Sequence, residues 1–257
     1  MINQGLSFIQ GNFDTVLILA VFGLQTLGPY NFASELSYLL FSKINPIFNK
    51  VVFPILSKHQ EDAGERQWII SESMLSHALI CLGLYLLLFF HLPELVDLLF
   101  KDDEGKILVF SKFICIMAMI RSVNNLAFSQ LLALGASRKL LQWNIAVLIF
   151  NYVFIFIIYL TKAPIVTFLE INIFVSLFVL TFTIYKMFQY YSNLSRGIRE
   201  VLYFLMYYLF ASVLLYGISL LHLYLVFSIG LSVVCLMVLS LLFYRDKVMR
   251  LLHLRIL

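Results

Sequence analysis

Charged side chains are scarce in this chain of 257 residues: Asp, Glu, Lys and Arg make up 12% of it, against about 25% in an average soluble domain. Apolar residues make up 62%, and the mean hydropathy is +0.95. A soluble globular domain is excluded by these values, which are typical of an integral membrane protein. The long apolar runs do not alternate with a period of two, so helices are predicted rather than an outer-membrane barrel.

The motifs of the common enzyme classes are also missing. The sequence contains no G-x-S-x-G, H-E-x-x-H, C-x-x-C or Walker lysine, and no loop is long enough for a soluble catalytic domain. Its three cysteines, Cys81, Cys115 and Cys235, lie inside apolar runs, which favours packing over disulfide or metal chemistry. Basic residues are spread among the loops, so no nucleic-acid partner is expected. We therefore predict a protein that is not an enzyme and that holds no cofactor or metal.

Eight apolar segments have about the 20 residues that a bilayer core requires. The fold class is accordingly predicted as an all-α polytopic membrane protein with about eight transmembrane helices. The predicted spans are 4–24, 29–56, 67–90, 107–134, 139–161, 164–187, 201–221 and 223–243. A tight break is expected at Gly28-Pro29, with Pro29 as the first residue of the second helix. Pro46 is expected to kink that helix and Pro54 to help end it.

The basic residues of the loops are strongly asymmetric. Eleven Lys and Arg lie on the side of the N-terminus, in 57–66, 135–139, 186–200 and the tail after 243, and three lie on the other side. Four more lie within predicted helices and are not counted. By the positive-inside rule, this places both termini in the cytoplasm. The longest outer loop, 92–106, is acidic and is expected to contain a short amphipathic helix.

Each of the first two helices carries a row of polar side chains at spacings of three and four. Residues with these spacings share one face of a helix. Against lipid such a face is costly, because hydrocarbon cannot satisfy amides, hydroxyls or carboxylates. The rows must therefore face each other, other helices or a hydrated cavity. They consist of Asn3, Ser7, Gln10 and Asp14 in the first helix, and Asn31, Glu35, Tyr38, Ser42, Asn45 and Asn49 in the second.

Two carboxylates and one guanidinium within these spans are the sharpest candidates. Asp14 and Glu35 suggest an ion relay or hydrogen bonds to a polar substrate in a cavity; the alternative is that they only hold the first two helices together. Arg121, with Asn125 one turn later, suggests a site for phosphate oxygens, and the alternative is an ion pair with Asp14 or Glu35. His77 is interpreted as a helix-packing residue.

Several sequence blocks resemble the polysaccharide flippase family, within the superfamily of multidrug and lipid-linked oligosaccharide exporters. They are GNFDTVLILAVFGLQTLGPYNFASEL (11–36), INPIFNKVVFPILSKHQED (44–62), LPELVDLLF (92–100) and LLALGASRK (131–139). Family members usually have two similar lobes. This chain resembles the second lobe, at 1–190, followed by two additional helices and a cytoplasmic tail at 191–257. The resemblance implies that a first lobe or a second copy of the chain completes the transporter.

The function implied by this resemblance is the flipping of a polyprenyl-diphosphate-linked oligosaccharide across the bacterial inner membrane. It implies alternating access around a polar cavity, with possible ion coupling at Asp14 or Glu35. The predicted partners are the lipid-linked oligosaccharide and membrane lipid. Alternatives are half of a cation-coupled multidrug exporter, a membrane glycosyltransferase or polymerase, and a non-transporting truncated fragment. The predicted cavity residues are Gln10, Asp14, Asn31, Glu35, Ser42, Asn45, Arg121 and Asn125.

Overall fold

A computed structural model describes residues 15–59, 61–100, 104–188, 206, 210–218 and 228–239, and within these residues every regular element is helical. Residues 15–22 are helical and precede α2. The labelled elements are α2 (Leu24–Lys58), α3 (Ala63–His77), the π-helix η1 (Ala78–Leu82), α4 (Gly83–Phe90), α5 (Leu92–Leu99), α6 (Glu104–Ala133), α7 (Ser137–Thr161) and α8 (Ile165–Phe188).

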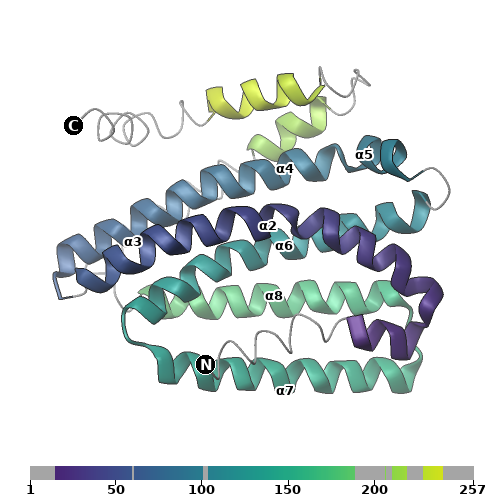
Figure 1. Ribbon diagram of the computed structural model, residues 1–257, viewed down its shortest axis with the longest axis horizontal. Helices are drawn as coiled ribbons and strands as arrows, with labels where there is room; N and C mark the ends of the chain where they lie inside the picture. Colours follow the sequence, from purple (N-terminus) through teal and green to yellow (C-terminus); the bar gives the residue numbers. More distant parts are fainter. Residues whose placement is uncertain are drawn as a thin grey trace.

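Helix α6 is the centre of the bundle. It packs most extensively against α2 and then against α8 (Figure 1). Elements α3, η1 and α4 follow one another as a continuous rod beside α2 and α6, while α7 lies along α8 on the opposite side of the molecule (Figure 1). Helix α6 is therefore enclosed by helices that precede it and by helices that follow it in the sequence.

Five helices of the described part are long and apolar enough to cross a membrane: Leu24–Lys58, Ala63–Phe90, Gly105–Ala133, Leu140–Thr161 and Ile165–Met187. They match the second to sixth predicted spans, and the protein is a multi-pass membrane protein with an all-helical fold. The first predicted span is described only from residue 15 onward. The last two lie largely outside the described residues, which include a shorter apolar helix, Ser228–Leu239.

The break between the first two helices was predicted at the wrong residue. The chain turns at Gly23, whose φ of 81° is readily accessible only to glycine, and α2 begins at Leu24. Pro29 lies inside α2 because a proline removes only one backbone hydrogen bond, a loss that membrane helices tolerate. Pro54 does not end the helix either, since α2 continues to Lys58.

Two helix ends on the side predicted as cytoplasmic have capping residues that the sequence provides, Asp62 before α3 and Gly135 after α6. The Asp62 carboxylate accepts hydrogen bonds from the amides of Gly64 and Glu65, at 2.8 and 3.0 Å, and so caps α3. After α6, Gly135 adopts a φ of 78°, with its amide bonded to Leu132 O and that of Ala136 to Leu131 O. This is the glycine-terminated Schellman turn, and it returns the chain into α7.

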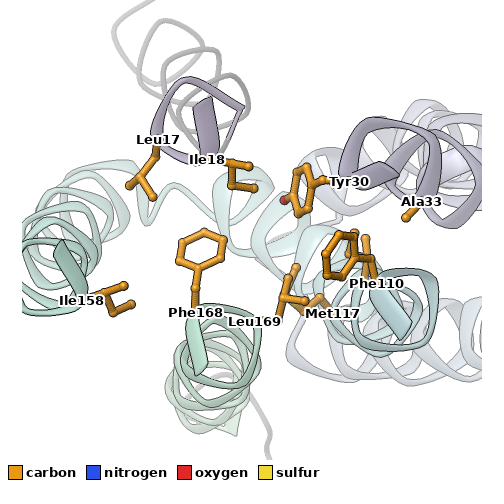
Figure 2. Close-up of a cluster of buried hydrophobic side chains, with 10 residues drawn as sticks. Leu17, Ile18, Tyr30, Ala33, Phe110, Met117, Ile158, Phe168 and Leu169 are labelled. Carbon is orange, nitrogen blue, oxygen red and sulfur yellow. The ribbon is translucent and has the colours of Figure 1, made fainter. Parts of the chain in front are cut away.

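The largest buried cluster fixes the N-terminal helix to the bundle. Leu17 and Ile18 project from helix 15–22 toward Phe168 of α8, and Tyr30 of α2 approaches from the other side (Figure 2). Phe110, Met117 and Leu169 complete the contact with α6 and α8, and Ile158 adds α7. Since all these helices meet in one cluster, the start of α2 has a defined orientation relative to α6.

The predicted amphipathic helix of the loop 92–106 is present as α5. Leu92 and Val96 are buried, one turn apart, whereas Glu94 and Asp97 are exposed. Among the cysteines, Cys81 and Cys115 are buried free thiols and Cys235 is half-buried. Within the described residues, no group of three or more His, Cys, Asp or Glu side chains is placed to hold a metal.

Candidate functional site

Arg121 lies in the middle of α6, where it connects three helices. Its Nη1 donates a hydrogen bond to the Tyr38 hydroxyl of α2 at 2.6 Å, and its Nε donates to Ser176 Oγ of α8 at 3.4 Å. The guanidinium carbon is 6.0 Å from the centre of the Tyr38 ring, within the range of a cation–π interaction. The side chain is half-buried. A guanidinium fork is thus held in a fixed direction inside the membrane span.

A fully buried polar cluster lies next to this arginine. Asn45 Oδ1 of α2 accepts a hydrogen bond from Ser122 Oγ of α6 at 3.0 Å and lies 2.6 Å from His77 Nε2. Because an amide oxygen only accepts, Nε2 of His77 carries the proton in this contact. Cys81 Sγ lies 2.9 Å from the same Ser122 oxygen. The cluster joins α2, α3, η1 and α6 through side chains.

The backbone is irregular at the level of this cluster. His77 immediately precedes the π-helical turn η1, which contains Cys81, and Asn45 immediately precedes Pro46 inside α2. A π-turn and a helical proline each disturb the regular ladder of backbone hydrogen bonds. The side-chain hydrogen bonds therefore join two neighbouring helices at positions where the regular backbone hydrogen bonds of each helix are disturbed.

One turn further along α2, Asn49 Nδ2 donates to Asn125 Oδ1 of α6 at 2.8 Å. Asn45, Asn49 and Asn125 are thus engaged in hydrogen bonds between helices, so this part of the row faces other helices. Whether Asn45 and Asn125 also line a cavity remains a prediction.

The polar row of α2 has a buried edge and an exposed edge. At 100° per residue, the row covers about 80° of the helix surface, from Asn45 at one edge through Tyr38 and Asn31 to Glu35 at the other. Tyr38 and Asn45 at one edge contact α3 and α6. Glu35 and Ser42 at the other edge are exposed, and Asn31, midway between the two edges, is half-buried. The row therefore straddles the border between the helix interface and the free surface of α2.

Gln10 and Asp14 lie outside the described residues, so their positions, and the predicted relation of Asp14 to Arg121, remain predictions. Lys43 is exposed. The interpretation of His77 as a packing residue agrees with its burial and its contact with Asn45.

Two polar contacts were not expected from the sequence. His91 is buried at the α4–α5 corner, with Nε2 2.9 Å from Ser228 Oγ and Nδ1 2.9 Å from Leu87 O. Gln130 of α6 donates to Ser73 of α3 at 2.7 Å. Gln130 lies inside the predicted span 107–134, and a polar side chain there was a signal that sequence reasoning did not use.

Comparison with known proteins places this arrangement in a biological context. Residues 1–103 match the model of a family described as polysaccharide biosynthesis protein. They include α2, α3, η1, α4 and α5, and hence the complete polar row of α2. Arg121 and Asn125 lie beyond the matched residues.

A curated relative supports the same relationship. Over 128 residues the chain is 25% identical to the lipopolysaccharide biosynthesis protein WzxC of Escherichia coli (strain K12). The match covers 50% of this chain and 26% of WzxC, so the chain spans about a quarter of the length of that relative. No solved structure matches the chain.

Proposed function

We propose that this chain is one lobe of a flippase that moves a polyprenyl-diphosphate-linked oligosaccharide across the bacterial inner membrane. Residues 1–190 form the lobe, 191–257 add two helices and a tail, and both termini are cytoplasmic. The proposal is supported by the polysaccharide biosynthesis match and by the five membrane-span candidates. Transport by alternating access needs no chemical step and hence no cofactor.

The observation that carries the proposal is the exposed edge of the polar row. Glu35 and Ser42 are exposed on a helix that is long and apolar enough to span the membrane. A carboxylate at the centre of a bilayer costs about 2.5–3.5 kcal/mol on insertion scales, so lipid is an unfavourable neighbour. The Glu35 carboxylate and the Ser42 hydroxyl instead form hydrogen bonds with water, in a cavity that this chain shares with a first lobe or a second copy. There the sugar hydroxyls form hydrogen bonds with Glu35 and Ser42, and with Asn31 and Gln10.

Arg121 is the cationic side chain best placed for the diphosphate. Its planar guanidinium suits bidentate hydrogen bonding to phosphate oxygens, and its contacts with Tyr38 and Ser176 fix its direction in advance. Asn125 is one turn along the same helix. The proposed coupling ion acts at Asp14 or Glu35, so Asp14→Asn and Glu35→Gln lower transport while the protein still folds.

The test is genetic complementation in the bacterium that encodes the chain, which also supplies any partner. The gene is deleted and replaced by wild type, Arg121→Gln, Arg121→Lys or Arg138→Gln, and the export of the lipid-linked oligosaccharide is measured. Loss of a charge-assisted hydrogen bond of about 1.5–3 kcal/mol predicts at least a roughly tenfold loss with Arg121→Gln. The lysine variant keeps the charge without the fork and gives an intermediate rate.

Arg138→Gln is the matched control, because Arg138 is an exposed arginine at the start of α7. It is expected to export at the wild-type rate. Full export by Arg121→Gln would show that Arg121 does not bind the diphosphate. Unimpaired export in the deletion strain would mean that the chain does not transport this glycan.

A further inference from the structure

A groove of about 740 Å³ opens between helix 15–22 and the second half of α7, within the size range of about 300–1,000 Å³ typical of ligand pockets. Its lining consists of aliphatic and aromatic side chains. Leu17 lies at its inner wall, on the side of helix 15–22 that faces α7 (Figure 2). The lining residues are Val16, Leu17, Ala20, Val21, Ile149, Tyr152, Val153, Phe156 and Tyr159.

The α7 wall of the groove is about as long as a lipid chain in one leaflet. Its α7 positions run from Ile149 to Tyr159, which at 1.5 Å per residue is about 15 Å, half of a hydrocarbon core of about 30 Å. It occupies the half of α7 that ends at Thr161, the end that the basic-residue asymmetry places on the outer side. It therefore faces the outer leaflet.

A cation lies at the outer end of the groove. Lys162 is exposed and directly follows the last residue of α7, three positions after Tyr159; its backbone is left-handed, with a φ of 50°. An apolar groove with a cation at its mouth is complementary to a lipid that carries phosphate next to its hydrocarbon chain. A second copy docked symmetrically through the same groove would instead bring two Lys162 side chains together.

We propose that this groove binds the prenyl chain of a polyprenyl-diphosphate lipid in the outer leaflet, with Lys162 contacting its phosphates. The inference rests on the proposed function, because it assigns the lipid part of the same substrate. Arg121 and the polar edge of α2 act on the diphosphate and sugar during transfer. The groove retains the tail at the membrane periphery.

The test uses photo-cross-linking of the full chain, together with any partner that copurifies, in lipid nanodiscs. Two probes of matched reactivity are compared: polyprenyl diphosphate and phosphatidylglycerol, each with a diazirine in the hydrocarbon chain. Labelled peptides are identified by mass spectrometry. The polyprenyl probe is expected to label peptides containing residues 15–22 and 145–163 of the wild type.

Three variants locate the site. In Val153→Trp the indole fills the groove, so labelling of these peptides should be lost. Ile157→Trp is the matched control: Ile157 is an exposed β-branched residue one turn away that does not line the groove, and labelling should persist. Lys162→Gln removes the charge and should weaken labelling about tenfold.

Equal labelling by phosphatidylglycerol would overturn the proposal, as would unchanged labelling in Val153→Trp. A cross-link from Ala20→Cys to residues 1–14, or to a second copy, would also overturn it by assigning the groove to another occupant. Flipping of the polyprenyl lipid is measured separately in vesicles. Labelling without flipping would support the groove as a lipid site and refute the proposed function. Flipping without labelling of the groove would support the proposed function and refute the lipid site.

Discussion

At the scale of single residues, the membrane interior makes each polar side chain depend on its partners. Arg121 donates hydrogen bonds to Tyr38 and Ser176, and Asn45 accepts hydrogen bonds from His77 and Ser122. Such contacts stabilise membrane helix pairs by about 0.6 kcal/mol on average and about 1.7 kcal/mol at most. Each contact is weak, but the contacts of Arg121 fix the direction of its guanidinium, which a site for a diphosphate requires.

Asn45→Ala tests whether the buried cluster holds the helices together. The substitution removes the oxygen that accepts from both His77 and Ser122, so we expect a loss of about 1–2 kcal/mol in unfolding free energy, measured in mixed detergent micelles. Ser42→Ala, on the same helix, removes an exposed hydroxyl that donates to Leu39 O one turn earlier, and should change stability by less than about 0.5 kcal/mol. Equal effects of the two would contradict the distinction between the two edges of the row.

Asp62 makes the start of α3 sensitive to pH. The amides of Glu65 and Gly64 hold the pKa of its carboxyl below its ordinary value. A lowered folded-state pKa means that the contribution to stability is present above the ordinary pKa and is lost as the pH falls through the folded-state value. We expect Asp62→Asn, which can still cap the helix, to flatten the acid side of the pH–stability curve. Melting temperatures measured across the acidic range, with Glu61→Gln as control, would show this, and parallel curves for wild type and Asp62→Asn would argue against it.

At the scale of elements, the sequence predicted that the polar residues of α2 share one face but not which edge contacts α6. Helical spacing fixes the angles of residues relative to each other and leaves the rotation of the helix undetermined. That rotation is set by the core cluster, where Tyr30 and Ala33 of α2 meet Phe110 and Met117 of α6. For the same reason, the partners of Arg121 could not be derived from its position in the sequence.

The helix boundaries show a second limit of sequence reasoning. The long apolar runs predicted five spans well, because length and hydropathy determine them directly. The first break was predicted at Gly28-Pro29 because proline is favoured at the first helical position. The turn actually requires a positive φ, which Gly23 provides. Gly23 directly precedes α2 and has a positive φ, whereas Gly28 lies inside α2 and does not.

This pair offers a matched prediction. Gly23→Ala places a Cβ at a φ of 81°, which costs roughly 1–2 kcal/mol, although there is open space around it. Gly28→Ala lies inside α2 with open space and should stabilise the helix by about 0.5–1 kcal/mol. Unfolding free energies in detergent measure both. A destabilising Gly28→Ala together with a neutral Gly23→Ala would place the break where the sequence first suggested.

At the scale of the whole molecule, α2 is an unusual member of the bundle because it is both polar and exposed. Large apolar side chains such as Phe32, Leu39 and Ile47 are also exposed on it. Exposed apolar groups suit lipid or another helix, whereas Glu35 and Ser42 suit water or a polar partner. A helix of this kind is expected beside a cavity that the chain shares with another lobe.

We therefore expect Glu35→Cys to cross-link to that partner. In native membranes treated with a short bifunctional maleimide, a band larger than one chain should appear, either twice its mass or the mass of the chain plus a first lobe. Phe174→Cys, exposed on α8 away from this edge, should give no such band. Monomers alone from both variants, in membranes where transport is intact, would contradict the need for a second lobe.

The most direct test of the central claim, that the exposed edge of the α2 polar row lines a hydrated path, is cysteine accessibility in intact membranes. The two cysteine variants are Ser42→Cys and Ile47→Cys. The side chains of Ser42 and Ile47 are both exposed on α2, but only Ser42 belongs to the polar row. A membrane-impermeant thiol reagent should modify Ser42→Cys and leave Ile47→Cys unreacted, because lipid excludes the reagent. Protection of Ser42→Cys, or equal reaction at both positions, would contradict the account.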